Sequence, residues 1–136
     1  MNVVAVTTVI CMLSLVVTAV PVRASHFDGM EAYRQNDFKT AMREFKACED
    51  DVKCMYMLGI IYEKGEGIKS DYFEAAQWFR KASEKDDPVS QYRLGRLYER
   101  GLGVEENQTE AMRLYKKSAQ KGNPNAKQAL KRLESK

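Results

Sequence analysis

The sequence predicts an all-α protein, a solenoid of antiparallel helix pairs, and three observations support this prediction. A pattern of leucine, glycine and tyrosine recurs after 36 residues, and a fixed spacing of this size is typical of solenoids. Each period contains two helix-start signals, in which a polar capping residue precedes a proline or a glutamate. The composition, with 44% hydrophobic and 30% charged residues, excludes a disordered chain and a bundle of membrane helices.

The first 24 residues differ from the rest because they are apolar and contain a single charge, Arg23. The run Val3–Val20 is followed by PVRAS, in which Val22 and Ala24 have small side chains. A signal peptidase recognises small residues at these two positions, so we predict a signal peptide at 1–24 that is cleaved after Ala24. The alternative is an uncleaved membrane anchor, because the 18 residues of the apolar run almost span a bilayer.

Residues 25–50 are expected to form a degenerate first repeat. The stretch DFKTAMREF (Asp37–Phe45) aligns with DYFEAAQWF (Asp71–Phe79) at a spacing of 34 residues, two short of the period. The helix expected before it, near Phe27–Gln35, lacks the leucine–glycine pair and the G-x-G loop of the later repeats.

Repeat 2 (51–86) and repeat 3 (87–122) carry the full pattern, and each is expected to contain two helices. The first helix begins after Asp87-Pro88 in repeat 3, and the same capping position is Asp51 in repeat 2. The second helix begins at a predicted capping box, Asp71-x-x-Glu74 or Asn107-x-x-Glu110. The apolar stripe of the second helices includes the aromatic residues Trp78, Phe79 and Tyr115, which we assign to the core.

A G-x-G sequence separates the two helices of each repeat and has two interpretations. A phosphate-binding loop of the dinucleotide type requires a preceding strand and a third glycine, but Ser70 and Glu106 occupy the third position. Glycine can instead end the first helix in a left-handed conformation and reverse the chain within a few residues. We therefore predict helix-to-helix turns. The last segment, 123–136, is predicted to be a C-terminal capping helix, with Lys131 at the position of the helix glycine.

The repeats resemble the Sel1-like repeat (SLR), a relative of the tetratricopeptide repeat. Their sequences are CMYMLGIIYEKGEGI…DYFEAAQWFRKA and SQYRLGRLYERGLGV…NQTEAMRLYKKS, and the resemblance extends from Asp51 to about Leu133. It implies a right-handed solenoid. Small exported bacterial members also begin with a unit similar to AYRQNDFKTAMREF. The chain departs from the family pattern at Asp86, which replaces a helix-ending glycine that Gly122 retains.

Two cysteines would remain after cleavage, Cys48 and Cys54, and two cysteines in an exported protein predict one disulfide. The pair also resembles the cysteine-rich secreted branch of the SLR family, whose disulfides join the second helix of one unit to the first helix of the next. In that branch the cysteines are eight residues apart, whereas here they are six apart, in a connection two residues shorter. Two reduced, buried cysteines are the alternative, and the spacing fits neither a redox C-x-x-C motif nor a zinc site.

No catalytic constellation is recognisable. The single histidine, His26, would lie near the new N-terminus, and the sequence has no nucleophile elbow, H-E-x-x-H motif or P-loop. We expect no metal and no cofactor. The net charge of +3 is too small to predict nucleic-acid binding, which requires a clustered basic face.

The expected function is binding of a protein or peptide in a concave groove lined by the first helices. By analogy with tetratricopeptide repeats, the exposed groove positions are Tyr56, Ile60, Glu63, Lys64, Tyr92, Arg96, Glu99, Arg100, Gln128 and Arg132. We therefore predict a non-catalytic, exported scaffold or adaptor, periplasmic or secreted and monomeric, that contacts a membrane only if residues 1–24 are retained. The alternatives are a cell-wall or β-lactam hydrolase, as suggested for cysteine-rich relatives, and a membrane-anchored adaptor.

Overall fold

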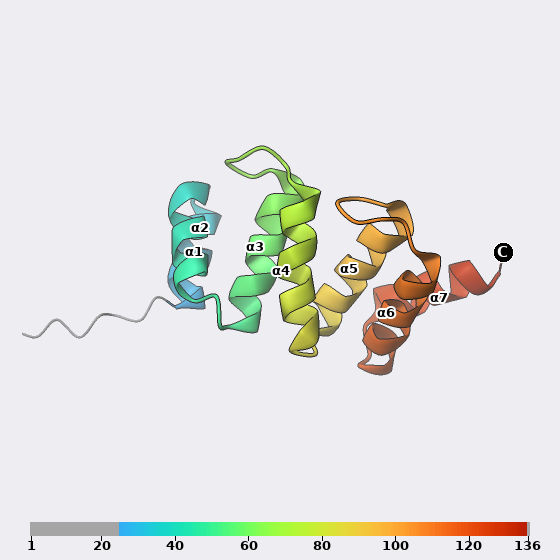
Figure 1. The fold of residues 1–136 in the computed structure, drawn as a ribbon. Coiled ribbons are helices and arrows are strands. Elements are labelled where there is room, and N and C mark those ends of the chain that lie inside the picture. The colour runs from blue at the N-terminus through green and yellow to red at the C-terminus, as the bar shows by residue number, and fades with distance from the viewer. Residues whose placement is uncertain (1–24, 136) are drawn as a thin grey trace, which may run out of the picture.

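The computed structural model describes residues 25–135, so the predicted signal peptide or anchor at 1–24 lies outside the described residues. The described part contains seven helices and no strands. The helices are α1 (His26–Arg34), α2 (Phe38–Ala47), α3 (Val52–Lys64), α4 (Tyr72–Glu84), α5 (Pro88–Arg100), α6 (Gln108–Gln120) and α7 (Pro124–Glu134). They form antiparallel pairs that follow one another in a row, with the first pair and α7 at opposite ends (Figure 1). The all-α solenoid is therefore confirmed.

The helices begin at the predicted polar residues. Asp71, Asp87 and Asn107 each accept a hydrogen bond from the backbone N–H three residues further on, and α5 and α7 have proline in the first turn. The reciprocal half of the predicted capping boxes is not formed in α4 or α6, and in α6 Glu110 binds Arg113 instead. A complete capping box occurs where none was predicted, between Ser25 and Asp28.

The two G-x-G sequences are helix-to-helix turns, as predicted. Gly65 and Gly101 end α3 and α5 in the left-handed conformation, with φ of 73° and 61°. The second glycine of each turn approaches the preceding unit. A Cβ atom on Gly67 would lie 2.6 Å from the Cβ of Phe38, and one on Gly103 would lie 2.2 Å from the carbonyl carbon of Tyr72. Each turn therefore packs against the start of the second helix in the unit before it.

A helix glycine allows the two helices of each unit to pack closely. A Cβ atom on Gly59 would lie 2.5 Å from the ring of Phe79, and one on Gly95 would lie 2.7 Å from the ring of Tyr115. Gly29 in α1 has the same relation to Phe45, at 2.4 Å. The first unit therefore keeps this glycine, although it lacks the leucine before it and the G-x-G turn. A shift of the sequence by 36 residues does not align Gly29 with Gly59, because the two glycines are only 30 residues apart.

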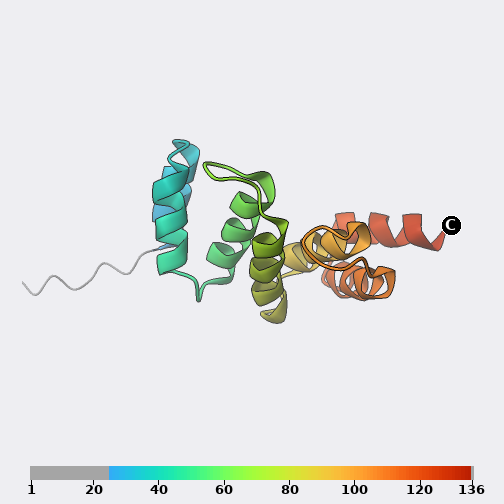
Figure 2. The same ribbon diagram turned by 45° about the horizontal axis from the view of Figure 1, so that its top comes forward.

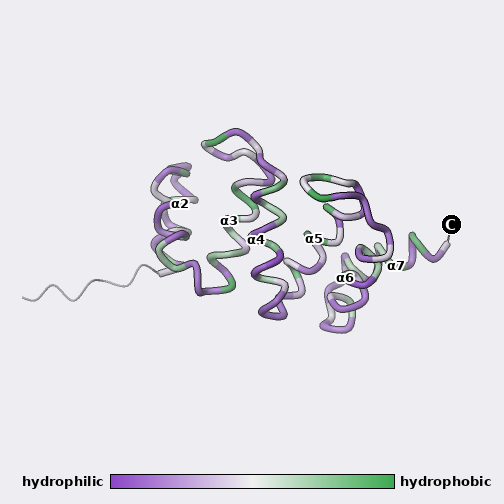
Figure 3. The backbone as a smooth tube through the Cα atoms, viewed as in Figure 1, coloured by the Kyte–Doolittle hydropathy of each residue, from purple (hydrophilic) through white to green (hydrophobic). Residues whose placement is uncertain are grey.

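The core runs along the row as connected clusters between successive helices. Trp78, Phe79 and Tyr115 are buried, as predicted. Each helix alternates between hydrophobic and hydrophilic segments, and both long turns carry hydrophobic segments (Figure 3). Ile68 and Val104 in these turns pack against the core. The view in Figure 2 shows the same row of helix pairs. Within residues 25–135, no helix is both long and apolar enough to cross a membrane.

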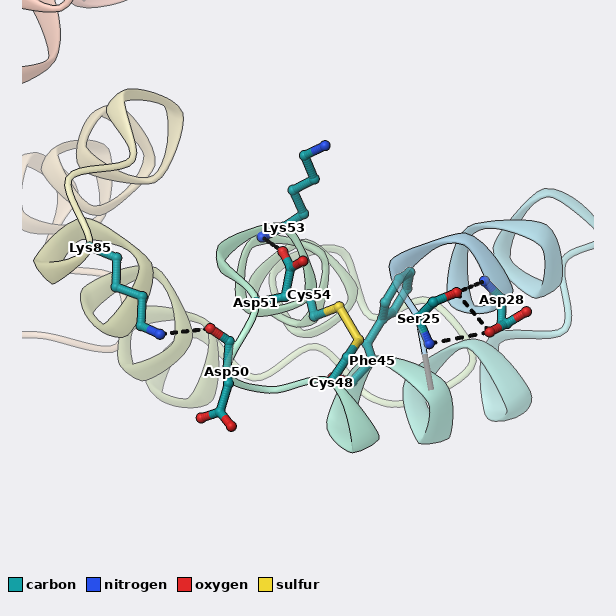
Figure 4. The surroundings of a disulfide bond; sticks show 9 residues. All are labelled: Ser25, Asp28, Phe45, Cys48, Asp50, Asp51, Lys53, Cys54 and Lys85. Carbon is teal, nitrogen blue, oxygen red and sulfur yellow. Dashed lines mark hydrogen bonds between the residues drawn. A yellow bond between two sulfur atoms is a disulfide. The ribbon is translucent and has the colours of Figure 1, made fainter. Parts of the chain in front are cut away.

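A disulfide joins Cys48 to Cys54, with Cα atoms 6.0 Å apart, which agrees with the predicted pairing. Cys48 caps α2 and Cys54 lies in the first turn of α3, beside the buried ring of Phe45 (Figure 4). The six-residue separation arises from a short helix and not from a short connection. Helix α2 has 10 residues whereas α4 has 13, and the connection from α2 to α3 is not shortened.

Candidate functional site

A cavity of about 610 Å³ lies between α5 and α7, close to the C-terminal end of the row. We call it the α5–α7 cavity and define it by its lining residues, Tyr92, Arg96, Glu99, Arg100, Tyr115, Asn125, Gln128, Ala129 and Arg132. Six of the ten predicted groove positions are among them. The other three residues were not predicted as groove positions, and Tyr115 was assigned to the core, where it also lies. Tyr115 lines the cavity, and its ring contacts the ring of Tyr92, with 5.7 Å between centroids.

Among the described residues of the cavity wall, Glu99 is the only acidic one, and its carboxylate is engaged within the protein. It accepts a hydrogen bond of 2.6 Å from the hydroxyl of Tyr115 and forms an ion pair of 2.7 Å with Arg132. Burial, followed by the hydrogen bond to Glu99, raises the pKa of Tyr115 above its usual value. The hydroxyl therefore stays protonated and continues to donate to Glu99 at neutral pH.

Two arginines of the wall lack such partners. Arg96 and Arg100 form no ion pair or side-chain hydrogen bond with any residue of the described part of the chain. They lie four residues apart on α5, so their side chains project from the same face of the helix. Arg96 is half-buried and Arg100 is exposed. Among the described residues, therefore, no acidic group compensates these two positive charges of the cavity.

The four predicted groove positions on α3 are not part of this cavity. Ile60 is only 4% exposed and packs in the core with Ala75 and Phe79. The prediction that Ile60 is an exposed groove residue is therefore wrong. The apolar side chain of Ile60 packs into the core, whereas Arg96, at the same position one repeat later, is charged and lines the cavity. Tyr56 and Glu63 are half-buried and Lys64 is exposed.

Besides the position of Ile60 and Arg96, a second position of the repeat distinguishes the two halves of the predicted groove. In repeat 3 this position is Arg93, whose guanidinium forms an ion pair of 2.9 Å with Glu63 of α3. In α7 the equivalent residue, 36 positions later, is Ala129. Its methyl group is too short to pair with Glu99 as Arg93 pairs with Glu63, and the cavity lies beside it. Aligning the repeats by their 36-residue period shows that alanine stands where the preceding unit has arginine, but it does not predict the cavity beside Ala129.

A smaller depression beside the disulfide includes the predicted terminal histidine. It is lined by Ser25, His26, Phe27, Cys48, Asp50, Asp51 and Lys53. Partial burial lowers the pKa of His26, so this side chain is mainly neutral at pH 7. Between Ser25 and Ser135, no group of three or more His, Cys, Asp or Glu side chains is placed to hold a metal ion.

Several solved structures share this architecture. A Sel1 repeat protein from Oxalobacter formigenes superposes with a TM-score of 0.74 and 28% identity, over 78% of this chain and 44% of that one. The second structure is c5321, a protective antigen that is present in uropathogenic Escherichia coli strains and displays an SLR fold. It superposes with a TM-score of 0.72 and 30% identity, over 77% of this chain and 24% of that one. The chain thus spans less than half the length of these two relatives.

Helicobacter pylori cysteine rich protein B has the same fold, with a TM-score of 0.64 and 23% identity, over 77% of this chain and 96% of that one. No curated protein matches the chain significantly. The Sel1 repeat matches twice in succession, at residues 52–87 and 88–123, which together make up more than half of the chain. With its glycine turns and helix pairs at the same spacing, the chain belongs to the Sel1 repeat family.

Proposed function

We propose that this protein is an exported, non-catalytic module that holds a protein or peptide partner on the face formed by α5 and α7. Proteins with Sel1 repeats generally mediate protein–protein interactions, and scaffolds of this family are typically non-catalytic. Stacked helix pairs suit this role because their first helices form a continuous face for an extended partner.

The observation that carries the proposal is the α5–α7 cavity. Its volume of about 610 Å³ is within the range of protein sites for small ligands and peptide side chains. Its wall combines aromatic residues and arginines, which are favoured at the centres of protein interfaces. The side chains come from helices of a packed solenoid, so most of the site is formed before a partner arrives.

Export is the second part of the proposal. The Cys48–Cys54 disulfide is stable in oxidising compartments such as the periplasm or the exterior of the cell. The apolar N-terminal segment with its small-residue motif favours the same destination. A protein that is exported and then forms this bond would meet its partner outside the cytoplasm.

Affinity capture from a cell-envelope extract tests the binding face. The bait is the disulfide-bonded protein, compared with the double variant Arg96→Ala/Arg100→Ala and with the control Lys127→Ala/Lys131→Ala. The control also removes two positive charges, but from exposed positions of α7 that do not line the cavity. We expect one protein to be retained by the wild type and the control and lost from the Arg96/Arg100 variant. Equal capture by all three baits would place any interaction elsewhere.

A further inference from the structure

We infer that the α5–α7 cavity binds an acidic peptide segment and that Arg96 and Arg100 hold a carboxylate of that segment. The inference rests on the proposed function and adds the chemistry of the partner to it. It begins with the charges of the wall, which contains three arginines and one glutamate. Glu99 is bound by Arg132 and Tyr115, so the remaining positive charge belongs to Arg96 and Arg100.

These two arginines are suited to an incoming carboxylate. A guanidinium group presents several N–H donors in a planar fork that matches the two oxygens of a carboxylate. Arg96 is half-buried without an acceptor among the described residues, so it has lost part of its hydration and gained no protein partner in return. A carboxylate would supply the missing acceptor, and the surrounding protein would make the interaction stronger than in water.

The same position in the preceding unit does not offer this site. There Glu63 is already paired with Arg93, and the residue equivalent to Arg96 is the buried Ile60. At the position where α5 has Arg93, α7 has Ala129. This difference between the units has two effects at the α5–α7 junction. It opens the cavity, and it leaves Arg132 to pair with Glu99 while Arg96 stays unpaired.

The remaining lining residues favour a peptide over a small inorganic anion. Asn125 and Gln128 carry side-chain amides, and both residues are exposed at the edge of the cavity. An amide can donate to a backbone carbonyl and accept from a backbone N–H of a bound chain. The half-buried ring of Tyr92 offers an apolar surface for a neighbouring side chain. A single phosphate or sulfate ion could accept from the amide N–H groups, but it has no backbone N–H to donate to the amide oxygens and no apolar part to cover the ring of Tyr92.

Selection from a random heptapeptide library tests the chemistry of the partner without knowledge of its identity. The target is the protein expressed from its full coding sequence and purified with the disulfide intact. We expect aspartate and glutamate to be enriched in the selected peptides. Replacing the acidic residues of the best peptide by asparagine or glutamine should weaken its binding about tenfold, measured by fluorescence anisotropy, because charge-assisted hydrogen bonds are lost.

The variant Ala129→Arg separates binding in the cavity from attraction to a positive surface. It places an arginine where repeat 3 has Arg93, so the fold already accommodates this side chain in an equivalent position. The variant is more positive than the wild type, yet its cavity is filled. We expect its affinity for the selected acidic peptide to fall at least about tenfold, whereas the control Lys131→Gln should change it by less than about twofold. Circular dichroism and thermal unfolding verify that both variants are folded.

Three results would overturn the inference. The first is a pool of selected peptides that is neutral, basic or not enriched in any residue. The second is a peptide that binds equally well after its acidic residues are replaced by asparagine or glutamine. The third is an affinity of Ala129→Arg for the selected peptide that equals or exceeds the affinity of the wild type. If the Arg96/Arg100 variant still loses a captured protein in these cases, the proposed function stands and only the acidic chemistry is wrong. If all baits also capture the same proteins, both proposals fail.

Discussion

The junction between the first unit and repeat 2 differs from the junction between repeats 2 and 3 in what holds it together. Both use a turn of the following unit, in which Gly67 or Gly103 packs against the preceding second helix. At the first junction the helices are short, with 9 and 10 residues in α1 and α2, and a disulfide is added. At the second junction two 13-residue pairs pack without a covalent link. The covalent bond therefore lies at the junction that has the shorter helices.

The largest effect should come from the uncrosslinked junction. Gly103→Ala would place a methyl group against the backbone of Tyr72 and would also force φ of 67° on a non-glycine residue. We expect a loss of about 3 kcal/mol in the free energy of unfolding, from the left-handed conformation and from overpacking. Chemical denaturation monitored by circular dichroism measures it.

Gly122→Ala is the matched control for this prediction. Gly122 also has a positive φ, of 90°, but nothing lies within 4 Å of the position of its Cβ atom. Only the conformational cost of about 1 kcal/mol should remain. Equal losses in the two variants would mean that the contact of the turn with Tyr72 does not contribute to the second junction.

Removal of the disulfide should have the next largest effect and should act locally. The double variant Cys48→Ala/Cys54→Ala should lose about 2 kcal/mol, as expected for a closed loop this small. Hydrogen exchange should become faster in α1 and α2, while α5 and α6 keep the protection of the wild type. Uniform loss of protection along the chain would show that the disulfide stabilises the whole solenoid rather than its first junction.

A hydrogen bond across the first junction should have the smallest effect of the three. The hydroxyl of Tyr33 in α1 donates to Glu66 in the turn of repeat 2, at 2.6 Å. Tyr33→Phe should cost about 1 kcal/mol at pH 7, whereas Tyr56→Phe, whose hydroxyl has no such bond among the described residues, should cost less.

The same tyrosine makes the first junction sensitive to high pH. Burial and the hydrogen bond to Glu66 raise the pKa of Tyr33 in the folded state. The protonated form is therefore favoured by folding, and its contribution is complete below pH 10 and declines as the pH rises through the raised pKa. The free energy of unfolding of the wild type should fall more steeply above pH 10 than that of Tyr33→Phe. Parallel pH profiles would argue against this hydrogen bond.

Much of the fold could be predicted because its determinants are local and recur. Asp71, Asp87 and Asn107 cap helices through contacts three residues away, and Gly65 reverses the chain at its own position. The burial of Ile60 and the opening beside Ala129 depend on how adjacent units are rotated against each other, which the repeat spacing does not specify. Gly29 was missed because the first unit has a different internal spacing, although its contact with Phe45 is the same as in the later units.

Two lysines occupy the same place along the edge of the solenoid. Lys85 donates to the backbone carbonyl of Asp50 at 2.6 Å, and Lys121 donates to that of Asp86 at 3.0 Å and pairs with its carboxylate. Each lysine therefore binds the last residue of the preceding unit, 35 positions earlier in the chain. Repeats 2 and 3 each supply the lysine that binds the preceding unit, together with their own capping residues and glycine turn. A duplicated copy of residues 87–122 would therefore bring its own capping residues, its own glycine turn and the lysine that reaches the unit before it.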